Sequence, residues 1–270
     1  MVFSRIREVF IRYRSGDGWL RSVLNLSMPL LVPVCLIGIW SLSSLRGWVS
    51  PDILPSPEDV YLALTNLFET GVLQTNAESS FIRLFWGVLT GTILGIVLGV
   101  SMGRYLSAEE YLLPTFKIFN LVPPLGWIPI LTLLIGIDDS MKILIIAKAV
   151  MTPVTLNTLQ GMKSVSSKYH EVASVHQFSA WRKVRLLYTP SLLPYIFTGI
   201  RYGFSNAWMA LVAVELLASS EGLGYLLSEG RQLFQLDVVL AMVVVIGVSG
   251  WLTDKFLGHV EAKLRRVGSN

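Results

Sequence analysis

Charged side chains lie inside apolar stretches that are long enough to be membrane helices, among them Lys117, Lys148, Arg201 and Glu215. An ion at the centre of a bilayer costs about 2.5 to 3.5 kcal/mol on insertion scales, so each charge should face a partner or a wet cavity. The two lysines have stems long enough to reach an interface. Arg201 and Glu215 lie fourteen residues apart on one stretch, about 21 Å of helical rise, so they cannot pair and need other partners.

Polar and aromatic residues between these two charges suggest a transport role. Asn206 and Trp208 lie between Arg201 and Glu215, and the four residues together are our candidates for a translocation pathway. Contacts between the helices of a bundle explain the same residues almost as well. Both interpretations stay open at this point.

Enzyme chemistry and metal binding have no support in the sequence. No Gly-Lys pair occurs, so the phosphate-binding loop of nucleotide hydrolases is absent, and no G-x-S-x-G nucleophile elbow occurs. His170, His176 and His259 lack the spacing of metal ligands, and the single Cys35 excludes an intrachain disulfide. We expect no catalytic residue, no metal and no cofactor on this chain.

The composition is that of an integral membrane protein. Mean hydropathy is +0.59, with 53% hydrophobic and 15% charged residues. A net charge of +4 does not indicate nucleic-acid binding here, because lysines and arginines spread along an apolar chain are typical of cytoplasmic loops. The sequence predicts an all-α polytopic protein with about six spans, at roughly Met28 to Leu45, Phe81 to Gly103, Leu112 to Ile137, Met141 to Gly161, Tyr195 to Ala218 and Leu236 to Phe256.

Two of these spans have special features. The first alanine of the chain is Ala63, so no A-x-A cleavage site follows the first span, which we expect to be a retained anchor. The third contains VPPLGWIP, whose prolines should break it into a helix, a bend and a second half-helix.

Orientation follows from the positive charges in the loops. Residues 47–80 contain no Lys or Arg and should face outward, with Ser56 capping a short amphipathic helix at the interface. The turn at Arg104 and the basic stretch from Lys163 to Arg185 should face the cytoplasm. We therefore expect a cytoplasmic arm over 1–27, one transmembrane domain over 28–260 and a cytoplasmic tail over 261–270.

A glycine series marks the second span: Gly87, Gly91, Gly95, Gly99 and Gly103. Steps of four residues wind slowly around a helix, so these glycines form a shallow groove that lets another helix approach closely. Packing inside one subunit is the favoured interpretation, and a gating surface is the alternative.

A polar, basic segment between two apolar stretches needs a separate explanation. In SSKYHEVASVHQFSAWRKVRLLYTPSLLP, Ser166 to Pro194, one of the first two serines can cap a short helix, with Glu171 in its first turn. Pro190 and Pro194 should stop the next helix before the fifth span. So short a helix needs a partner surface, either another protein or anionic lipid.

This segment resembles the EAA loop of the permease subunits of bacterial ABC importers. Glu171, Ala173 and Ser179 match the pattern, followed by Pro190 and Pro194. The likeness continues in TGIRYGFSNAWMALVAVELLASSEGLGYLL, ILPSPEDV and VPPLGWIPILTLLIGIDDSMKI, and it is to the subgroup that imports nitrate, bicarbonate, taurine and aliphatic sulfonates.

The resemblance implies a type I importer permease fold in the bacterial inner membrane, with both termini cytoplasmic. It also implies a homodimer, two copies of an ATPase that binds ATP and Mg, and an external substrate-binding protein that delivers a small anion. The region 166–180 would hold the coupling helix, and contact with the ATPase would fall to His170, Glu171, Ala173, Ser174, Gln177, Phe178 and Ser179. A standalone carrier or channel and a non-transporting scaffold remain the alternatives.

Two positions depart from the family pattern. Val172 replaces an alanine, and Gln177 replaces the glycine of the turn after the coupling helix. If that turn is left-handed, a residue other than glycine costs about 1 to 2 kcal/mol there. Either the turn is right-handed in this chain or Gln177 is strained.

Overall fold

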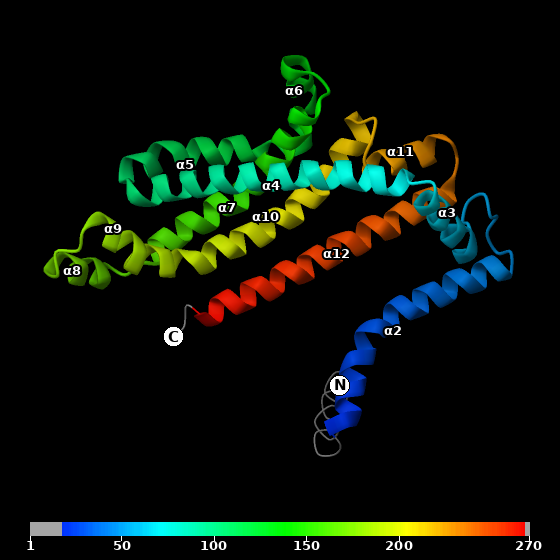
Figure 1. The fold of residues 1–270 in the computed structure, drawn as a ribbon, viewed down its shortest axis with the longest axis horizontal. Coiled ribbons are helices and arrows are strands. Elements are labelled where there is room, and N and C mark those ends of the chain that lie inside the picture. Colours follow the sequence, from blue (N-terminus) through cyan, green and yellow to red (C-terminus); the bar gives the residue numbers. More distant parts are fainter. Residues whose placement is uncertain (1–17, 268–270) are drawn as a thin grey trace, which may run out of the picture. The chain divides into compact units, whose positions relative to one another are not determined.

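The computed structural model describes the backbone of residues 18–267, and the side chains of residues 31–261 except Ser167, Lys168 and His170. All regular structure in this part of the chain is helical, which confirms the predicted class (Figure 1). The chain divides into two units, Met1–Asp59 and Val60–Asn270. The outer parts of the predicted arm and tail, 1–17 and 268–270, lie outside the described residues.

The first unit contains the long helix α2, Gly18–Leu45, and a loop that leads into α3, Pro57–Glu69. The indole Nε1 of Trp40 donates to the backbone oxygen of Pro55 at 2.9 Å, which ties the loop to α2. Ser56 caps α3 as predicted: its Oγ accepts from the backbone N–H of Asp59 at 3.1 Å, and Asp59 Oδ2 accepts from the N–H of Ser56 at 3.0 Å.

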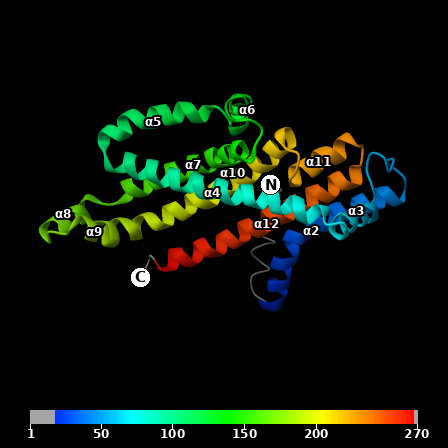
Figure 2. The same ribbon diagram turned by 45° about the horizontal axis from the view of Figure 1, so that its top comes forward.

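Three helices form the centre of the second unit: α4, Val72–Arg104, α7, Asp139–Ser164, and α10, Thr189–Ala218. They run side by side (Figures 1 and 2). α4 begins nine residues before the predicted span, because VLQTNAESS is too polar for a hydropathy search and yet helical. The backbone turns into α4 at Gly71, whose φ is +78°.

The glycine series lies along the contact between α4 and α7. A Cβ placed on Gly91 would lie 2.5 Å from the backbone oxygen of Ala147, and one on Gly95 would lie 2.7 Å from Cβ of Val154. Cβ atoms at the other three positions would overlap Ile146, Thr158 and Met162. The two backbones are close because these side chains are missing, the arrangement that the packing interpretation expects.

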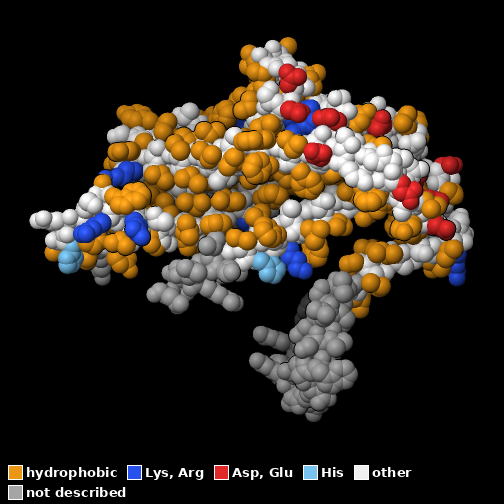
Figure 3. Space-filling model, in the orientation of Figure 1, with side chains coloured by type: hydrophobic (Ala, Val, Ile, Leu, Met, Phe, Trp, Pro, Cys, Tyr) orange, Lys and Arg blue, Asp and Glu red, His pale blue; other side chains and the backbone are white. Residues whose placement is uncertain are grey.

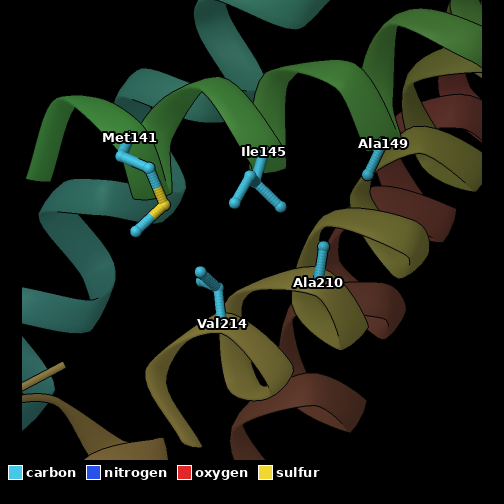
Figure 4. Close-up of a cluster of buried hydrophobic side chains, with 5 residues drawn as sticks. All are labelled: Met141, Ile145, Ala149, Ala210 and Val214. Carbon is cyan, nitrogen blue, oxygen red and sulfur yellow. The ribbon is translucent and has the colours of Figure 1, made fainter. Parts of the chain in front are cut away.

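Buried apolar side chains fill the space between α7 and α10. Met141, Ile145 and Ala149 of α7 face Ala210 and Val214 of α10 (Figure 4). In a membrane the gain comes from van der Waals contact between close helices, which fits the small residues in this cluster.

The predicted third span is a broken one. α5, Leu106–Leu121, is followed by the 3-10 turn η1, Pro124–Trp127, and by α6, Ile128–Ile135, with a bend of 88° between the two parts. The prolines of VPPLGWIP lie at this break, so the expectation of a helix, a bend and a half-helix is confirmed.

The polar segment after α7 folds as α8, Ser167–Val175, and α9, Ala180–Lys183. The prediction that Pro190 and Pro194 stop the second helix is wrong, because the chain continues without a break through the π-helical turn η2, Val184–Tyr188, into α10. Pro190 is the second residue of α10 and lies just after this turn, so the N–H that it lacks falls where the π-helical hydrogen bonding changes to the α-helical pattern. Here the wider turn brings the N–H of Thr189 to the oxygen of Val184.

The end of the chain contains one helix that was not predicted. α11, Leu223–Gln232, follows α10 at an angle of 44°, and α12, Leu236–Val267, returns along the unit. Among the described residues, α4, α7 and Leu236–Glu261 are each long and apolar enough to cross a membrane, and the bent pairs α5–α6 and α10–α11 bring the total to as many as five. The apolar part of α2 within the searched residues, Leu31–Leu45, is shorter.

Candidate functional site

A buried ionic network joins α4, α7 and α10 at the end of the unit where α11 begins. Its centre is Arg83 of α4, whose side chain is 1% exposed. Its Nε donates to Asp139 Oδ1 at 2.7 Å, its Nη1 to Glu215 Oε1 at 3.0 Å, and its Nη2 to Glu221 Oε1 at 2.6 Å. Nη1 also donates to the backbone oxygen of Glu221 at 2.8 Å. The guanidinium thus joins three parts of the chain that are distant in sequence: α4, the start of α7, and the end of α10 with the loop that follows it.

The carboxylate of Glu215 is fully engaged in this network. Besides Arg83, it accepts from Ser80 Oγ at 2.8 and 2.9 Å and from the backbone N–H of Gly224 at 2.9 Å. Gly222, with φ +118°, lies directly against it, and a Cβ there would overlap the carboxylate. Because every oxygen points at a protein donor, the geometry of Glu215 matches the bundle-contact interpretation.

The sequence analysis singled out Glu215 but not Arg83, Asp139 or Glu221, although for Arg83 a signal was present. Arg83 lies two residues inside the predicted second span, so the rule that flagged Arg201 and Glu215 applies to it equally. Lys142, also buried, donates to Asp139 Oδ1 at 3.1 Å. No sequence rule connects Asp139 and Glu221 to Arg83, since they follow it by 56 and 138 residues.

Arg201 finds its partners on α12. Nε and Nη2 donate to the two carboxylate oxygens of Asp254 at 3.0 and 3.2 Å, and Nη1 donates to Glu261 Oε2 at 3.3 Å. The group borders a hollow of about 520 Å³. The Arg201 side chain is 42% exposed, so its ion pairs with Asp254 and Glu261 are partly solvated and each contributes little stability.

Trp208 and Asn206 lie in different environments, one buried and one exposed. The Trp208 indole is 9% exposed, donates to the backbone oxygen of Ile246 at 3.2 Å and packs near the ring of Phe81. Asn206 is exposed and lines a second hollow of about 340 Å³. The four predicted pathway residues therefore do not converge, but Asn206 shares its hollow with another of the intramembrane charges that the sequence singled out.

That charge is Lys148 of α7, which lines the same hollow. Its Nζ donates to the backbone oxygen of Val122 at 2.8 Å and lies 5.1 Å from the ring centre of Phe119 and 5.8 Å from that of Trp127. The proline break after α5 leaves the Val122 carbonyl available to this lysine. Lys117, the other lysine of the sequence prediction, is exposed on α5.

The predicted coupling segment ends in a left-handed turn. The N–H of Phe178 donates to the oxygen of Ala173 at 2.9 Å and that of Gln177 to the oxygen of Ser174 at 3.0 Å, the two bonds of a Schellman motif. Gln177 occupies the left-handed position, with φ +49°. Of the two possibilities left open by the sequence, strain at Gln177 is therefore the correct one.

Among the described side chains of α8, one is buried. Ala173 is 2% exposed, whereas Val175 is 80% exposed and Tyr169, Glu171 and Val172 are also exposed. Ser179 Oγ caps α9 by accepting from the N–H of Arg182 at 3.4 Å. Phe178 is half-buried, and the side chain of His170 lies outside the described residues.

Comparison with known proteins gives one consistent family. Residues 91–266 match the model of the binding-protein-dependent transport system inner membrane component. A putative aliphatic sulfonates transport permease protein of Bacillus subtilis is 35% identical over 251 residues, 93% of this chain and 88% of the relative. The taurine transport system permease protein of Escherichia coli is 30% identical, with 85% of each chain covered.

A more distant relative and a solved structure agree with this. The nitrate import permease protein of Synechocystis is 27% identical, with 87% of each chain covered. A chain of the MetNI methionine ABC transporter in an inward-facing conformation is 16% identical and superposes with a TM-score of 0.51 over 80% of this chain and 99% of that one, which shows the type I importer permease fold. The chain belongs to the family of binding-protein-dependent transport system inner membrane components.

Proposed function

We propose that this chain is the membrane-spanning permease subunit of an ATP-driven importer for a small anion of the sulfonate, taurine or nitrate kind. The relatives named above are permeases for these anions and match over most of their length. The sequence lacks a nucleotide-binding loop, so ATP hydrolysis, with its bound ATP and Mg, is assigned to a separate ATPase subunit. The chain itself contributes a pathway and a mechanical link, not a catalytic residue.

The observation that carries the proposal is the geometry of α8. This nine-residue helix exposes Tyr169, Val172 and Val175, apolar or aromatic side chains on a helix too short to be stable alone. The Schellman turn at Gln177 and the capped α9 fix its connection to α10. A rigidly attached helix with an unpartnered apolar face suits docking into a groove of the ATPase.

The assembly follows from this assignment. Two copies of the chain would form the pathway, two ATPases would each receive one α8, and a binding protein would dock on the opposite side. Closure of the ATPases would draw the two copies of α8 together and turn the pathway outward.

We place the chain in a bacterial inner membrane with both termini cytoplasmic, and the distribution of charge about α8 supports this orientation. On the face shown in Figure 3, basic side chains lie about α8 and α9 with no acidic ones visible among them, whereas acidic side chains gather toward α6 and α11, with a basic group between them. Lys and Arg mark the cytoplasmic side of membrane proteins, so α8 would face the cytoplasm and the ATPase.

Reconstitution tests the proposal. The chain, its ATPase and its binding protein are assembled in proteoliposomes, and uptake of radiolabelled taurine is measured with and without ATP. We expect uptake only when all three components and ATP are present. Taurine uptake by the chain alone, without ATP, would instead identify a standalone carrier or channel.

A variant of α8 tests the link itself. Glu171→Ala should lower ATP-driven uptake at least tenfold and weaken co-purification of the ATPase. Glu110→Ala, at an exposed carboxylate of α5, is the matched control and should leave both unchanged. Normal uptake and normal ATPase binding in the Glu171 variant would contradict the docking role.

A further inference from the structure

The hollow beside Lys148 has the chemistry of an anion site. It has a volume of about 340 Å³ and is lined by polar and apolar groups from three segments: Asn120, Pro123, Pro124 and Leu125 from the α5–η1 break, Lys148, Ala149 and Thr152 from α7, and Asn206, Met209 and Ala210 from α10. Binding pockets for small molecules are about 300 to 1,000 Å³, so this one suits a small ligand. Met209 is 66% exposed, so the hollow opens to the surface of the chain there.

Lys148 brings an unneutralised positive charge to this hollow. It lies near the middle of α7, and within the described part of the chain no Asp or Glu is close enough to form an ion pair with it. Of its three N–H donors, one is used by the Val122 carbonyl. A charge held inside a membrane without a counter-ion is expensive, which makes a functional role the first hypothesis.

The aromatic rings near Lys148 hold the ammonium without neutralising it. The Phe119 and Trp127 ring centres are 5.1 and 5.8 Å from Nζ, within the range of cation–π attraction. Ring faces carry no net charge, so the full positive charge stays available to a ligand. Together with the Val122 hydrogen bond they fix where that charge lies.

Some polar groups around the ammonium have their hydrogen-bonding capacity used within the chain, and others do not. Asn120 Oδ1 already accepts from Thr152 Oγ1 at 2.5 Å, and the Val122 carbonyl is taken by Lys148 itself. Two of the three N–H donors of Lys148 have no acceptor within the described chain. The exposed amide of Asn206 likewise makes no hydrogen bond within the described chain. The unused N–H donors of Lys148 and the amide N–H donors of Asn206 are groups that can bind an oxyanion.

We infer that Lys148 and Asn206 form an anion subsite inside the permease, which binds the sulfonate or nitrate oxygens of the substrate during its passage. This rests on the proposed function and deepens it, because it assigns an anion-binding role to the permease in addition to the binding protein. The ammonium keeps its carbonyl and ring contacts when the anion leaves, so binding is weak enough for release, as conduction requires.

The test uses the assembled complex of permease, ATPase and binding protein in proteoliposomes, with radiolabelled taurine as the probe and ethanesulfonate and nitrate as competitors. Lys148→Gln should lower the rate of taurine uptake at least tenfold, and Lys148→Arg should retain at least a third of the wild-type rate. Lys117→Gln, at the exposed lysine of α5, is the matched control and should transport like the wild type. Uptake by Lys148→Gln within twofold of wild type would overturn the inference.

A second variant separates binding from a merely structural role of Lys148. Asn206 has no partner within the described chain, so Asn206→Leu should lower uptake severalfold while gel filtration and thermal unfolding of the complex stay unchanged. Unchanged uptake in this variant would remove Asn206 from the site.

Direct binding distinguishes failure of the subsite from failure of the proposed function. Saturation-transfer NMR of ethanesulfonate is measured on the detergent-purified permease–ATPase complex without binding protein. We expect a signal in the wild type and its loss in Lys148→Gln. If the wild type binds ethanesulfonate but shows no ATP-driven uptake, the proposed function fails and the subsite stands; ATP-driven uptake with equal NMR signals in both proteins overturns the subsite alone.

Discussion

Arg83 donates to Glu215 across 3.0 Å between two side chains that are 1% and 0% exposed, although 132 residues separate them in the sequence. Burying such a pair has a large desolvation cost, which the remaining hydrogen bonds must offset. Ser80 and the N–H of Gly224 complete the shell of Glu215, while Asp139 and Glu221 complete that of Arg83. Loss of any one of these side chains should therefore destabilise the others of the network.

Removal of Arg83 should be strongly destabilising. Arg83→Met leaves Glu215 as a buried carboxylate without its counter-ion, so we expect the free energy of unfolding in detergent to fall by about 3 to 5 kcal/mol. The measurement is thermal or denaturant unfolding of the purified chain.

The double variant Arg83→Met/Glu215→Met provides the control for this prediction. It removes both buried charges and should therefore be more stable than the single variant. A single variant as stable as the wild type would show that Glu215 does not depend on Arg83.

The glycine series should be sensitive to a single methyl group. A Cβ on Gly95 would lie 2.7 Å from Cβ of Val154, so Gly95→Ala should push α4 from α7 and destabilise the chain by about 1 to 3 kcal/mol. Unfolding in detergent measures this.

Gly247 of α12 offers a matched control, because a Cβ there would meet nothing within 4 Å. Gly247→Ala should be neutral or slightly stabilising, since alanine is the better helix former. Equal effects of the two substitutions would refute close packing as the reason for the glycine series.

Prediction from the sequence succeeded where the signal is local. The break at VPPLGWIP and the cap at Ser56 each depend on a few adjacent residues, and the structure has both. At Gln177 the sequence identified the unusual position but left its conformation open, which the positive φ decides. The stop predicted at Pro190 failed because a π-helical turn upstream accommodates the proline, and no sequence rule used here anticipates such a turn.

The candidate sites were less predictable because their geometry is not local. The hollow at Lys148 requires a carbonyl from the α5 break and an amide from α10, and neither position can be placed beside Lys148 from spacing alone. The Arg83 network likewise joins residues that only the packing of α4, α7 and α10 brings together.

The cap of α3 should weaken in acid. The hydrogen bonds from the Ser56 hydroxyl and backbone N–H lower the pKa of Asp59 below its ordinary value of 3.8. A carboxylate with a lowered pKa contributes stability at neutral pH, and that contribution is lost as the pH falls through the lowered pKa, below about 4.

NMR titration of the labelled Asp59 carboxyl checks this prediction. In Ser56→Ala the hydroxyl donor is gone, so the midpoint should rise toward the ordinary value. An identical midpoint in both proteins would show that Ser56 does not stabilise the charged form.

Replacement of Gln177 by glycine should stabilise the segment that follows α8. Gln177 lies at φ +49° and forms the left-handed position of the Schellman turn, where glycine has no Cβ penalty. We expect a gain of about 1 kcal/mol, visible as slower hydrogen exchange at the amides of Gln177 and Phe178.

The same substitution at Gln160, in the interior of α7, should instead destabilise by about 1 kcal/mol, since glycine is a poor helix former there. If Gln→Gly stabilises the chain at position 177 and destabilises it at position 160, the backbone conformation decides the effect. Faster hydrogen exchange in Gln177→Gly would mean that the glutamine side chain stabilises the turn despite its φ.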